Sequence, residues 1–474
     1  MVTLPAIRWG EPYESLEVEE LCHFLSGEPV ARVSSVGGGI VRRDAKHAPR
    51  ARAALQKLTP AELIACCQRA GELFESGTLT VGDSEQTPQQ FVQLQSATTG
   101  MPWAMCHANL QKNAFVLKNI QSILDALTRG LDLDILAQGF GDEGRGVTVS
   151  YQPQTTTLGA VLPSNSPGVH TLWLPVIPLQ ISLALKPGSQ EPWTPYRVCA
   201  AMVASGVPAE AISLYPGKGG DVGSALLSSC RRSMVFGGPE TIRQYASNPS
   251  VQVHGPGYSK ILLGDDAVDD WPEYLDLLVD SVSRNGGRSC INSSSIYASR
   301  HTREIAAAIA SRLGPVEALP PDDPDASLAA FTTPSVAAAI WRAIEDDLED
   351  PHTTHTTADH GPRLIEQPRS AYLRPTILHC DSADSPGANR EYMFPMASVV
   401  ACPQREMLAR IGPTLVCTAI TDNPAWRREL LESLDIDRLN LGPFPTPQLN
   451  WLQPHEGNLV EFLYRSRAVQ VKGR

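Results

Sequence analysis

Hydrophobic residues recur with two different spacings along the chain, and the change of spacing divides the chain into regions. Residues 50–75 and about 90–135 carry apolar residues at helical spacing, and Thr59-Pro60 has the residue types of a helix N-cap and first position. Residues 146–163 alternate apolar and polar positions, which predicts a β-hairpin running into a strand. We therefore expect an N-terminal helical region followed by β structure.

Beyond this point short apolar strands alternate with helical segments. The predicted strands are LGAVLP, ISLALKP, ISLYPG, SMVFGG and KILLGDD, and the intervening HTLWLPVIPLQ is expected to be a helix kinked by its prolines. Such alternation is typical of a doubly wound α/β fold, a parallel sheet with helices on both faces. A second α/β unit is expected over about 270–445, with the helix REIAAAIASRLG, and LVEFLYRSRAVQVKG predicts a terminal strand.

Composition and charge narrow the class of protein. The chain has 474 residues, 42% of them hydrophobic, which is enough for two or three domains with large cores. Its formal net charge of −12 argues against nucleic acid and anionic membrane surfaces as partners. No stretch has the apolar length of a membrane helix, and no signal peptide is visible at the start. The ten cysteines form neither CxxC pairs nor patterns with histidine, so we expect no metal site, no disulfide framework and a cytoplasmic location.

One cysteine differs from the others in its surroundings. Most lie in apolar runs such as LVCTAI, whereas Cys290 lies in RNGGRSCINSSSIYASR, among glycines and small polar residues. A thiol placed just before a helix, with backbone N–H groups around it, would have a lowered pKa and act as a nucleophile. A buried structural cysteine is the alternative interpretation.

A glycine-rich turn, YPGKGGDVGS, comes close to a dinucleotide-binding fingerprint without matching GxGxxG strictly. From spacing alone, a plain turn between strand and helix is the better interpretation.

Six segments, in this order and at these separations, resemble the aldehyde dehydrogenase superfamily over nearly the full chain. They are PSNSPG (163–168), LALKPGSQEP (183–192), ASGVPAEAISLYPGKG (204–219), VFGGPETI (235–242), NGGRSC (285–290) and EYMFPMASVV (391–400). The resemblance implies a Rossmann-like cofactor domain (1–145 and 159–252), an α/β catalytic domain (253–448) and a small β oligomerisation flap (146–158 and 449–474). It also implies a homodimer or homotetramer.

The resemblance implies roles for individual residues as well. Cys290 would form a covalent thiohemiacetal and thioester with an aldehyde or acyl thioester substrate, and Asn165 would donate to the developing oxyanion. On its own, Asn165 would be interpreted as a turn residue before Pro167. The cofactor would be NAD or NADP, bound by Lys186, Ser189, Gly217, Gly237, Gly238 and Glu391.

Ser189 stands where the family usually has an acidic residue that binds the adenosine ribose. Without that carboxylate there is less repulsion of a 2′-phosphate, so NADP is expected to bind at least as well as NAD.

The chain also departs from the family pattern. His254, in VHGPGYSK, occupies the place of the general-base glutamate; Leu174 follows Trp173 where a lysine is usual; and PTPQLNWLQPHEGN (445–458) replaces a glycine-rich motif. In the last segment we expect Trp451 and His455 to line the substrate funnel.

Three outcomes follow from the loss of the glutamate. Coenzyme A or another nucleophile takes the acyl group, or the enzyme works in the reductive direction, as in the acylating and acyl-reducing branches that lack this glutamate. Alternatively, His254 acts as the base of an ordinary hydrolytic enzyme. A third possibility is a catalytically impaired scaffold. The sequence favours the first.

Overall fold

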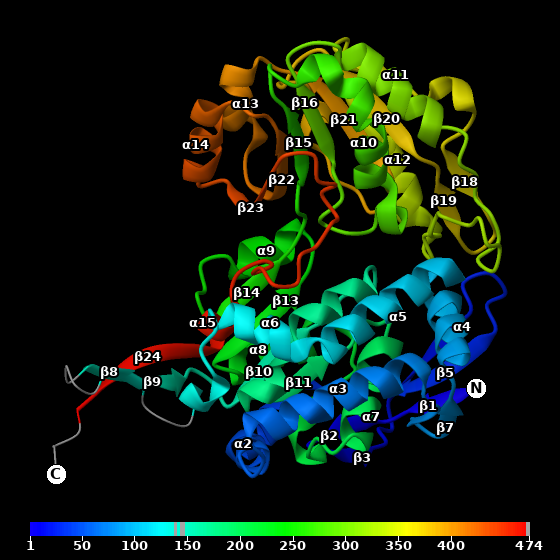
Figure 1. Cartoon of the computed structure of the whole chain (residues 1–474). Helices are drawn as coiled ribbons and strands as arrows, with labels where there is room; N and C mark the ends of the chain where they lie inside the picture. Colours follow the sequence, from blue (N-terminus) through cyan, green and yellow to red (C-terminus); the bar gives the residue numbers. More distant parts are fainter. Residues whose placement is uncertain (137–139, 143–146, 471–474) are drawn as a thin grey trace.

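The chain folds into two lobes, each built on its own sheet (Figure 1). The computed structural model describes residues 1–136, 140–142 and 147–470. The lower lobe contains a seven-stranded sheet in the order β14-β13-β10-β11-β12-β2-β3. Its strands are β2 (Ala6–Arg8), β3 (Glu11–Tyr13), β10 (Thr157–Val161), β11 (Ser182–Lys186), β12 (Ile212–Leu214), β13 (Arg232–Phe236) and β14 (Val251–His254).

The central strands of this sheet confirm the predicted doubly wound pattern. β10 pairs in parallel with β11 on one side and with β13 on the other, and β12 and β14 extend the sheet outward. From β10 the chain thus first adds β11 and β12 on one side. It then returns to the other side of β10 and adds β13 and β14. Loops that leave the carboxyl ends of strands at such a reversal form a crevice, which is where ligands bind in this class of sheet.

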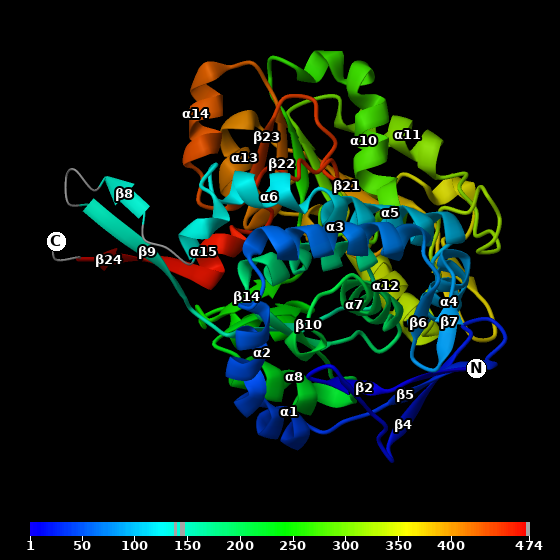
Figure 2. The same cartoon turned by 60° about the horizontal axis from the view of Figure 1, so that its bottom comes forward.

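Helices cover both faces of the lower sheet (Figure 2). One face carries α3 (Pro60–Ser76), α5 (Trp103–Lys118) and α7 (Trp193–Ala204), and the other carries α1 (Gly38–Asp44) and α8 (Gly219–Ser229). The predicted start of α3 is confirmed. Thr59 accepts a hydrogen bond from the Glu62 backbone, the Glu62 side chain bonds back to Thr59, and Pro60 is the first helical residue. The further predicted helices are α2 (Ala48–Leu55), α4 (Pro88–Thr99), α6 (Ile120–Leu127) and α9 (Pro239–Tyr245).

The upper lobe corresponds to the predicted second α/β unit but begins earlier than the expected residue 270, because the strand predicted in KILLGDD lies in this sheet and not in the lower one. Its sheet has the order β17-β20-β21-β16-β15-β22-β23. The strands are β15 (Lys260–Leu263), β16 (Ser295–Ala298), β17 (Thr353–His355), β20 (Thr376–Cys380), β21 (Met396–Ala401), β22 (Thr414–Ile420) and β23 (Ile436–Leu441). One face packs against α10 (Leu275–Ser283) and the predicted helix α11 (Thr302–Leu313), the other against α13 (Gln404–Ile411) and α14 (Pro424–Glu432). The chain passes from one sheet to the other between His254 and Lys260.

Two local predictions are wrong. HTLWLPVIPLQ forms two short 3-10 segments, Pro167–Leu172 and Leu174–Leu179, because its prolines cannot supply the N–H groups of an α-helix. Residues 146–163 do not form a hairpin: β9 (Val147–Pro153) and β10 lie in different sheets. The alternation of apolar and polar residues predicted both strands, but it carries no information about the strands with which they pair. Residue 146 lies outside the described part of the chain.

A separate three-stranded sheet projects from the lower lobe (Figure 1). β9 pairs antiparallel with β8 (Phe140–Asp142) on one side and with the tail strand β24 (Tyr464–Val469) on the other. The short helix α15 (Leu459–Leu463) precedes β24 and packs on the lobe, so the predicted terminal strand begins only at Tyr464. Because β24 lies at the end of the strand order, its outer edge has no strand beside it among the described residues.

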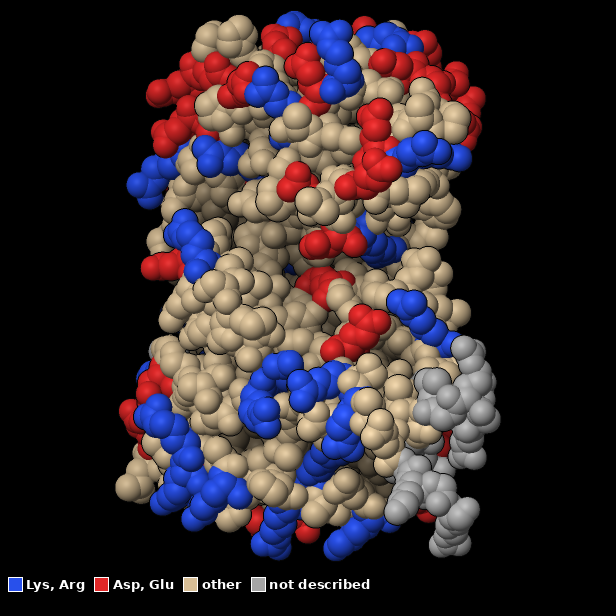
Figure 3. All heavy atoms as spheres, turned by 90° about the vertical axis from the view of Figure 1, so that its left-hand side faces the viewer, with Lys and Arg blue, Asp and Glu red and all other residues tan. Residues whose placement is uncertain are grey.

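Figure 3 shows the face from which the three-stranded sheet projects, and the molecule is narrower between the two lobes than across either lobe. Acidic side chains form a line along the middle of this face, across the narrow region between the lobes. Lys and Arg side chains predominate on the lower lobe. Of the helices that the structure describes, none is both long enough and apolar enough to cross a membrane.

Candidate active site

A cavity of about 380 Å³ lies between the two sheets and gathers six of the predicted site residues: Asn165, Gly237, Gly238, His254, Cys290 and Glu391. The first four follow or end β10, β13 and β14 at their carboxyl ends, and the last two precede β16 and β21 of the upper lobe. The crevice at the reversal of the lower sheet therefore faces the loop that carries the cysteine.

Glycines allow the backbone to approach closely around Cys290. The turn before it contains three successive residues with left-handed backbone, Asn285, Gly286 and Gly287, at φ of 55°, 62° and 66°. On the other side, a Cβ on Gly257 would lie 1.9 Å from the carbonyl oxygen of Cys290. The expected helix after Cys290 is absent from this described segment. A short turn leads instead into β16, and the backbone N–H of Ser294 donates to the carbonyl oxygen of Ser259 at 2.8 Å just before the strand begins.

The electrostatic surroundings of the thiol differ from the prediction. Burial raises the pKa of Cys290 well above its ordinary value, and the negative charges of Glu456 and Glu391 raise it further. The predicted lowering of this pKa is wrong, because the sequence indicated neither the burial of the thiol nor the two carboxylates whose charges act on it. In the free protein Cys290 is therefore a protonated thiol.

Glu456, which was not predicted as a site residue, lies against the thiol. Its Oε1 is 3.8 Å from Cys290 Sγ, within the range of a hydrogen bond from the thiol, and its Oε2 pairs with Nδ1 of His254. Burial raises the pKa of Glu456, but the charge and hydrogen bond of His254 outweigh burial and lower it to about 2. Glu456 is thus an ionised carboxylate that bridges the cysteine and the histidine.

Several contacts hold Glu456 in this position. Its backbone has a φ of 54°, unusual for a residue with a side chain, and its carbonyl oxygen accepts a hydrogen bond from the Gln252 side chain. His254 stacks on Phe236 with ring centroids 4.5 Å apart, and its Nε2 is buried without a hydrogen-bond partner among the described residues. Nε2 of His455 lies 3.4 Å from Oε1 of Glu456. Strained backbone of this kind concentrates at functional sites.

The segment that supplies Glu456 was singled out in the sequence, but for other residues. Trp451 packs against Phe115 at a ring distance of 6.5 Å, and neither Trp451 nor His455 is among the described residues that line the cavity. Glu456 is the only acidic residue of the replaced stretch 445–458, which is the one signal in the sequence that favoured it.

Asn165 and Glu391 lie on the wall of the same cavity. The Asn165 amide donates to the sulfur of Met393 at 3.3 Å. Glu391 accepts hydrogen bonds from the backbone N–H groups of Gly257, at 3.0 Å, and Tyr258. Burial raises the pKa of Glu391 to about 7 in spite of these two donors. The carboxylate thereby ties the upper lobe to the segment that links β14 to β15.

The three remaining predicted residues lie outside the cavity, at the edge of the lower lobe. Ser189 and Gly217 line a narrow crevice together with Glu19, which belongs to β4 (Val18–Cys22). Lys186 ends β11; burial lowers its pKa and the charge of Glu19 raises it. Glu19 accepts a hydrogen bond from Ser35 at 3.2 Å. A carboxylate therefore lies beside Ser189 although position 189 itself lacks one.

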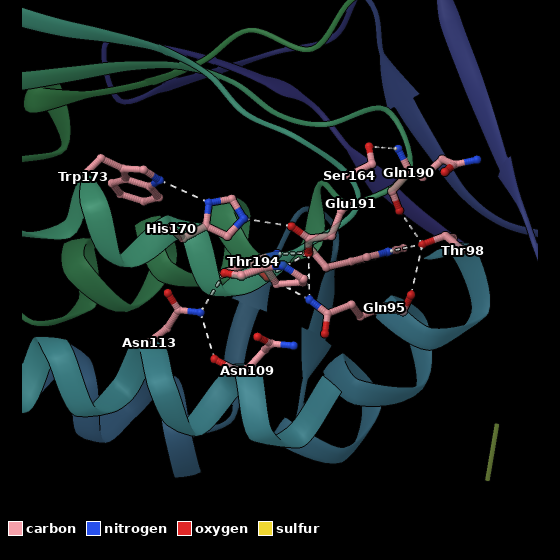
Figure 4. Close-up of polar contacts among 12 residues, drawn as sticks. Gln95, Thr98, Asn109, Asn113, Ser164, His170, Trp173, Gln190, Glu191 and Thr194 are labelled. Atoms are coloured by element: carbon pink, nitrogen blue, oxygen red, sulfur yellow. Dashed lines mark hydrogen bonds and ion pairs between the residues drawn. The ribbon is translucent and has the colours of Figure 1, made fainter. Parts of the chain in front are cut away.

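A buried polar network lies behind the Asn165 loop (Figure 4). Nε2 of His170 is 2.9 Å from the Glu191 carboxylate, and both side chains are 0% exposed. Trp173 Nε1 donates to His170 Nδ1 at 3.1 Å, so the proton of a neutral His170 is on Nε2 and is donated to Glu191. The other carboxylate oxygen accepts hydrogen bonds from the Gln95 amide and from both the backbone and hydroxyl of Thr194.

This network connects the segment that follows β11 to the loop of Asn165. Glu191 is adjacent to Gln190, whose backbone N–H donates to the Ser164 hydroxyl at 3.1 Å, next to Asn165. On the other side of the loop, the Asn113 amide donates to the carbonyl of Pro167 at 3.1 Å. The position of Asn165 thus depends on hydrogen bonds at residues on both sides of it.

Comparisons with known proteins agree with this architecture. The model of the "Aldehyde dehydrogenase family" matches residues 11–411 of this chain. A glutarate-semialdehyde dehydrogenase of Pseudomonas putida is 23% identical over 381 residues, which are 78% of this chain and 74% of that protein.

Solved structures match over essentially the whole length. A mutant indole-3-acetaldehyde dehydrogenase of P. syringae, in complex with NAD⁺ and IAA, has a TM-score of 0.82 and 18% identity, and the match covers 100% of this chain and 97% of that one. An E. coli NADP dependent enzyme has a TM-score of 0.80 and 17% identity, with 99% and 98% covered.

Proposed function

Because this chain belongs to the aldehyde dehydrogenase family, we propose that it oxidises an aldehyde with NAD(P) through a covalent adduct on Cys290. One observation carries the proposal: the Cys290 thiol, the Asn165 amide, the Glu391 carboxylate and the Gly237–Gly238 turn line a single cavity. The relatives named above act on aldehydes or bind NAD⁺ or NADP according to their descriptions, which supports the same chemistry here.

The residues around the cavity fit a dinucleotide. A Cβ on Gly238 would have no atom within 4 Å, so the turn after β13 has open space above its backbone. This turn would hold the phosphates, Glu391 the nicotinamide ribose, and Lys186, Ser189 and Gly217 the adenosine end. When bound, NAD(P)⁺ supplies the acceptor for the hydride that leaves the substrate carbon.

The chain's own groups carry out the remaining steps. The sulfur of Cys290 adds to the aldehyde carbon, and the thiol proton passes to the neighbouring Glu456 carboxylate, 3.8 Å away. Asn165 donates to the oxygen that gains negative charge. Loss of the hydride then leaves the acyl group on Cys290 as a thioester.

The choice between the two cofactors depends on Glu19. The absence of an acid at Ser189 predicted that NADP binds at least as well as NAD, and this stays a prediction. Glu19 lines the same crevice, and its carboxylate would repel a 2′-phosphate and accept a hydrogen bond from a 2′-hydroxyl. We therefore propose that NAD is preferred.

Acyl release by coenzyme A, which the sequence favoured because His254 replaces the glutamate, also stays a prediction, as do the reductive direction and the impaired scaffold. The prediction of release by coenzyme A assumed that no carboxylate near the thiol could act as a base. Glu456 supplies one. The geometry therefore supports the hydrolytic alternative better, although with Glu456 rather than His254 at the sulfur.

The test is the Cys290→Ser variant. Propanal and benzaldehyde are offered with NAD⁺ and with NADP⁺, and formation of the reduced cofactor is followed by absorbance. We expect loss of turnover with unchanged cofactor binding, measured by fluorescence titration. Cys22→Ser is the matched control, because Cys22 is also partly exposed but lies outside the cavity. Near-normal turnover in Cys290→Ser would contradict the proposal.

A further inference from the structure

We propose that Glu456 is the base that releases the acyl group from Cys290 as a carboxylic acid, and that His254 is its positioning residue. The inference rests on the proposed function, because it requires an acyl group on the Cys290 sulfur. It assigns a catalytic role to a segment that lies 166 positions beyond the nucleophile in sequence.

The first argument is the geometry of the carboxylate. Glu456 is the described acidic residue that contacts the sulfur directly, with Oε1 at 3.8 Å from Sγ. Both residues line the same cavity, so a water molecule that reaches the acyl carbon also reaches this carboxylate. A base must lie within hydrogen-bond reach of the proton that it removes, and Glu456 meets this requirement for a water molecule next to the sulfur.

The second argument is that His254 is poorly placed to act alone. Its Nδ1 is engaged by Glu456, and its Nε2 is buried while the ring stacks on Phe236. These contacts fix the imidazole against the carboxylate and leave the carboxylate between the imidazole and the sulfur. His254 therefore acts through Glu456: it favours the ionised form of the carboxylate and fixes the orientation of that side chain.

The third argument concerns the charges that face Glu456. His254 and His455 contact it directly, and Asp437, on β23, acts on it from a greater distance. Arg438 and Lys112 influence His455 and add positive charge to the same surroundings. The contacts nearest to Glu456 are thus with imidazoles, which favour the ionised form that a base needs.

The step balances without a further reactant besides water. Once the proton from the first addition has left to solvent, Glu456 takes a proton from a water molecule, and the water oxygen bonds to the acyl carbon. The carbon–sulfur bond then breaks, and the sulfur leaves with the proton from Glu456. The products are the free carboxylic acid and the Cys290 thiol, and no atom is oxidised or reduced.

The experiment loads the acyl group without the cofactor. p-Nitrophenyl acetate is added to the full-length protein to acetylate Cys290, excess reagent is removed, and the acetyl group is followed by peptide mass spectrometry. We expect Glu456→Gln to slow acetyl loss by about 100-fold or more. Glu461→Gln is the matched control, five positions further along, where the side chain is largely exposed, and it should release acetyl at the wild-type rate.

The outcomes separate the two proposals. If the wild type takes up no acetyl group on Cys290, both the nucleophile and its base are wrong. If Cys290 is acetylated but Glu456→Gln loses acetyl as fast as the wild type, only the base is wrong. If acetyl leaves the wild type only after coenzyme A is added, the water route is likewise wrong, whereas the nucleophile stands.

A second variant tests the positioning role and does not rely on loss of the carboxylate. In His254→Gln the Glu456 carboxylate loses the imidazole that pairs with it, so its pKa should rise from the value of about 2 that the wild type has. The acetyl-release rate of the variant should then fall in acid at a higher pH than that of the wild type. Identical pH profiles would overturn the role of His254, and Glu456→Gln would still test the base.

Discussion

His170 and Glu191 form a pair in the interior of the lower lobe, with His170 Nε2 at 2.9 Å from the Glu191 carboxylate and no solvent exposure of either side chain (Figure 4). The other hydrogen bonds of the carboxylate come from the Gln95 amide and from the backbone and hydroxyl of Thr194. A buried carboxylate is tolerated only when its lone pairs are satisfied. The pair therefore stabilises the fold and, through Gln190 and Ser164, the loop of Asn165.

Substitution His170→Ala should destabilise the protein by about 3 kcal/mol, because it leaves Glu191 short of a donor and Trp173 without an acceptor. The measurement is the free energy of unfolding in urea. His301→Ala is the matched control: His301 pairs with Asp269 at the same distance of 2.9 Å, but at the surface. Its effect should be small, and equal losses in the two variants would contradict the argument from burial.

Substitution Glu19→Gln should shift cofactor preference towards NADP. Removal of the carboxylate beside Ser189 takes away the repulsion of a 2′-phosphate, and we expect the ratio of the Kd for NADPH to that for NADH to fall about tenfold, or about 1.4 kcal/mol. Fluorescence titration measures both constants. Glu20→Gln, at the next position of β4 and exposed, is the control. An unchanged ratio in Glu19→Gln would mean that this crevice does not hold the ribose.

Glu391 should make the stability of the protein fall as the pH rises through the weakly acidic range. Its pKa is about 7 in the folded protein because of burial, against an ordinary value of 4.5. The folded state thus binds the proton more tightly, so ionisation above about pH 4.5 costs stability until about pH 7, roughly 3 kcal/mol in total. Urea unfolding at about pH 5 and about pH 8 should show a smaller loss in Glu391→Gln than in the wild type. Parallel losses would contradict the raised pKa.

The projecting sheet predicts how the protein assembles. The outer edge of β24 presents backbone groups that a strand of a second copy can pair with, and its residues from Arg465 to Ala468 are exposed in the single chain. We expect a homodimer or homotetramer by light scattering. A chain that ends after Tyr464 keeps the hydrogen bond of that side chain to Leu179 but lacks the strand, and it should be monomeric. An unchanged assembly would exclude this edge as the interface.

The sequence predicted where helices and strands lie along the chain better than it predicted which strands pair with each other. Strong local signals were sufficient for α3, whose N-cap at Thr59 is read from neighbouring residues, and for the alternation from β10 to β13. The hairpin failed because pairing is a property of distant segments. β9 pairs with β24, more than 300 positions away along the chain, as in the pairing of Tyr464 with Pro153.

The same distinction applies to the site. Short motifs predicted that Cys290, Asn165 and Glu391 belong together, and the three residues line one cavity. Glu456 was missed because it reaches the cavity from a segment without regular structure and contacts His254, which lies 202 positions earlier in the chain. The direction of the Cys290 pKa was missed for the same reason, since the burial that raises it, and the two carboxylates that raise it further, come from other segments.

The two carboxylates beside Cys290 also affect the durability of the enzyme. Peroxides attack thiolates far faster than thiols, and the resulting sulfinic and sulfonic acids are not readily reversed. A cysteine whose proton is retained by burial and by nearby negative charge is therefore less reactive towards oxidants while no substrate is present. We therefore expect the substrate-free protein to lose activity to peroxide more slowly than an enzyme whose active-site cysteine is held as a thiolate.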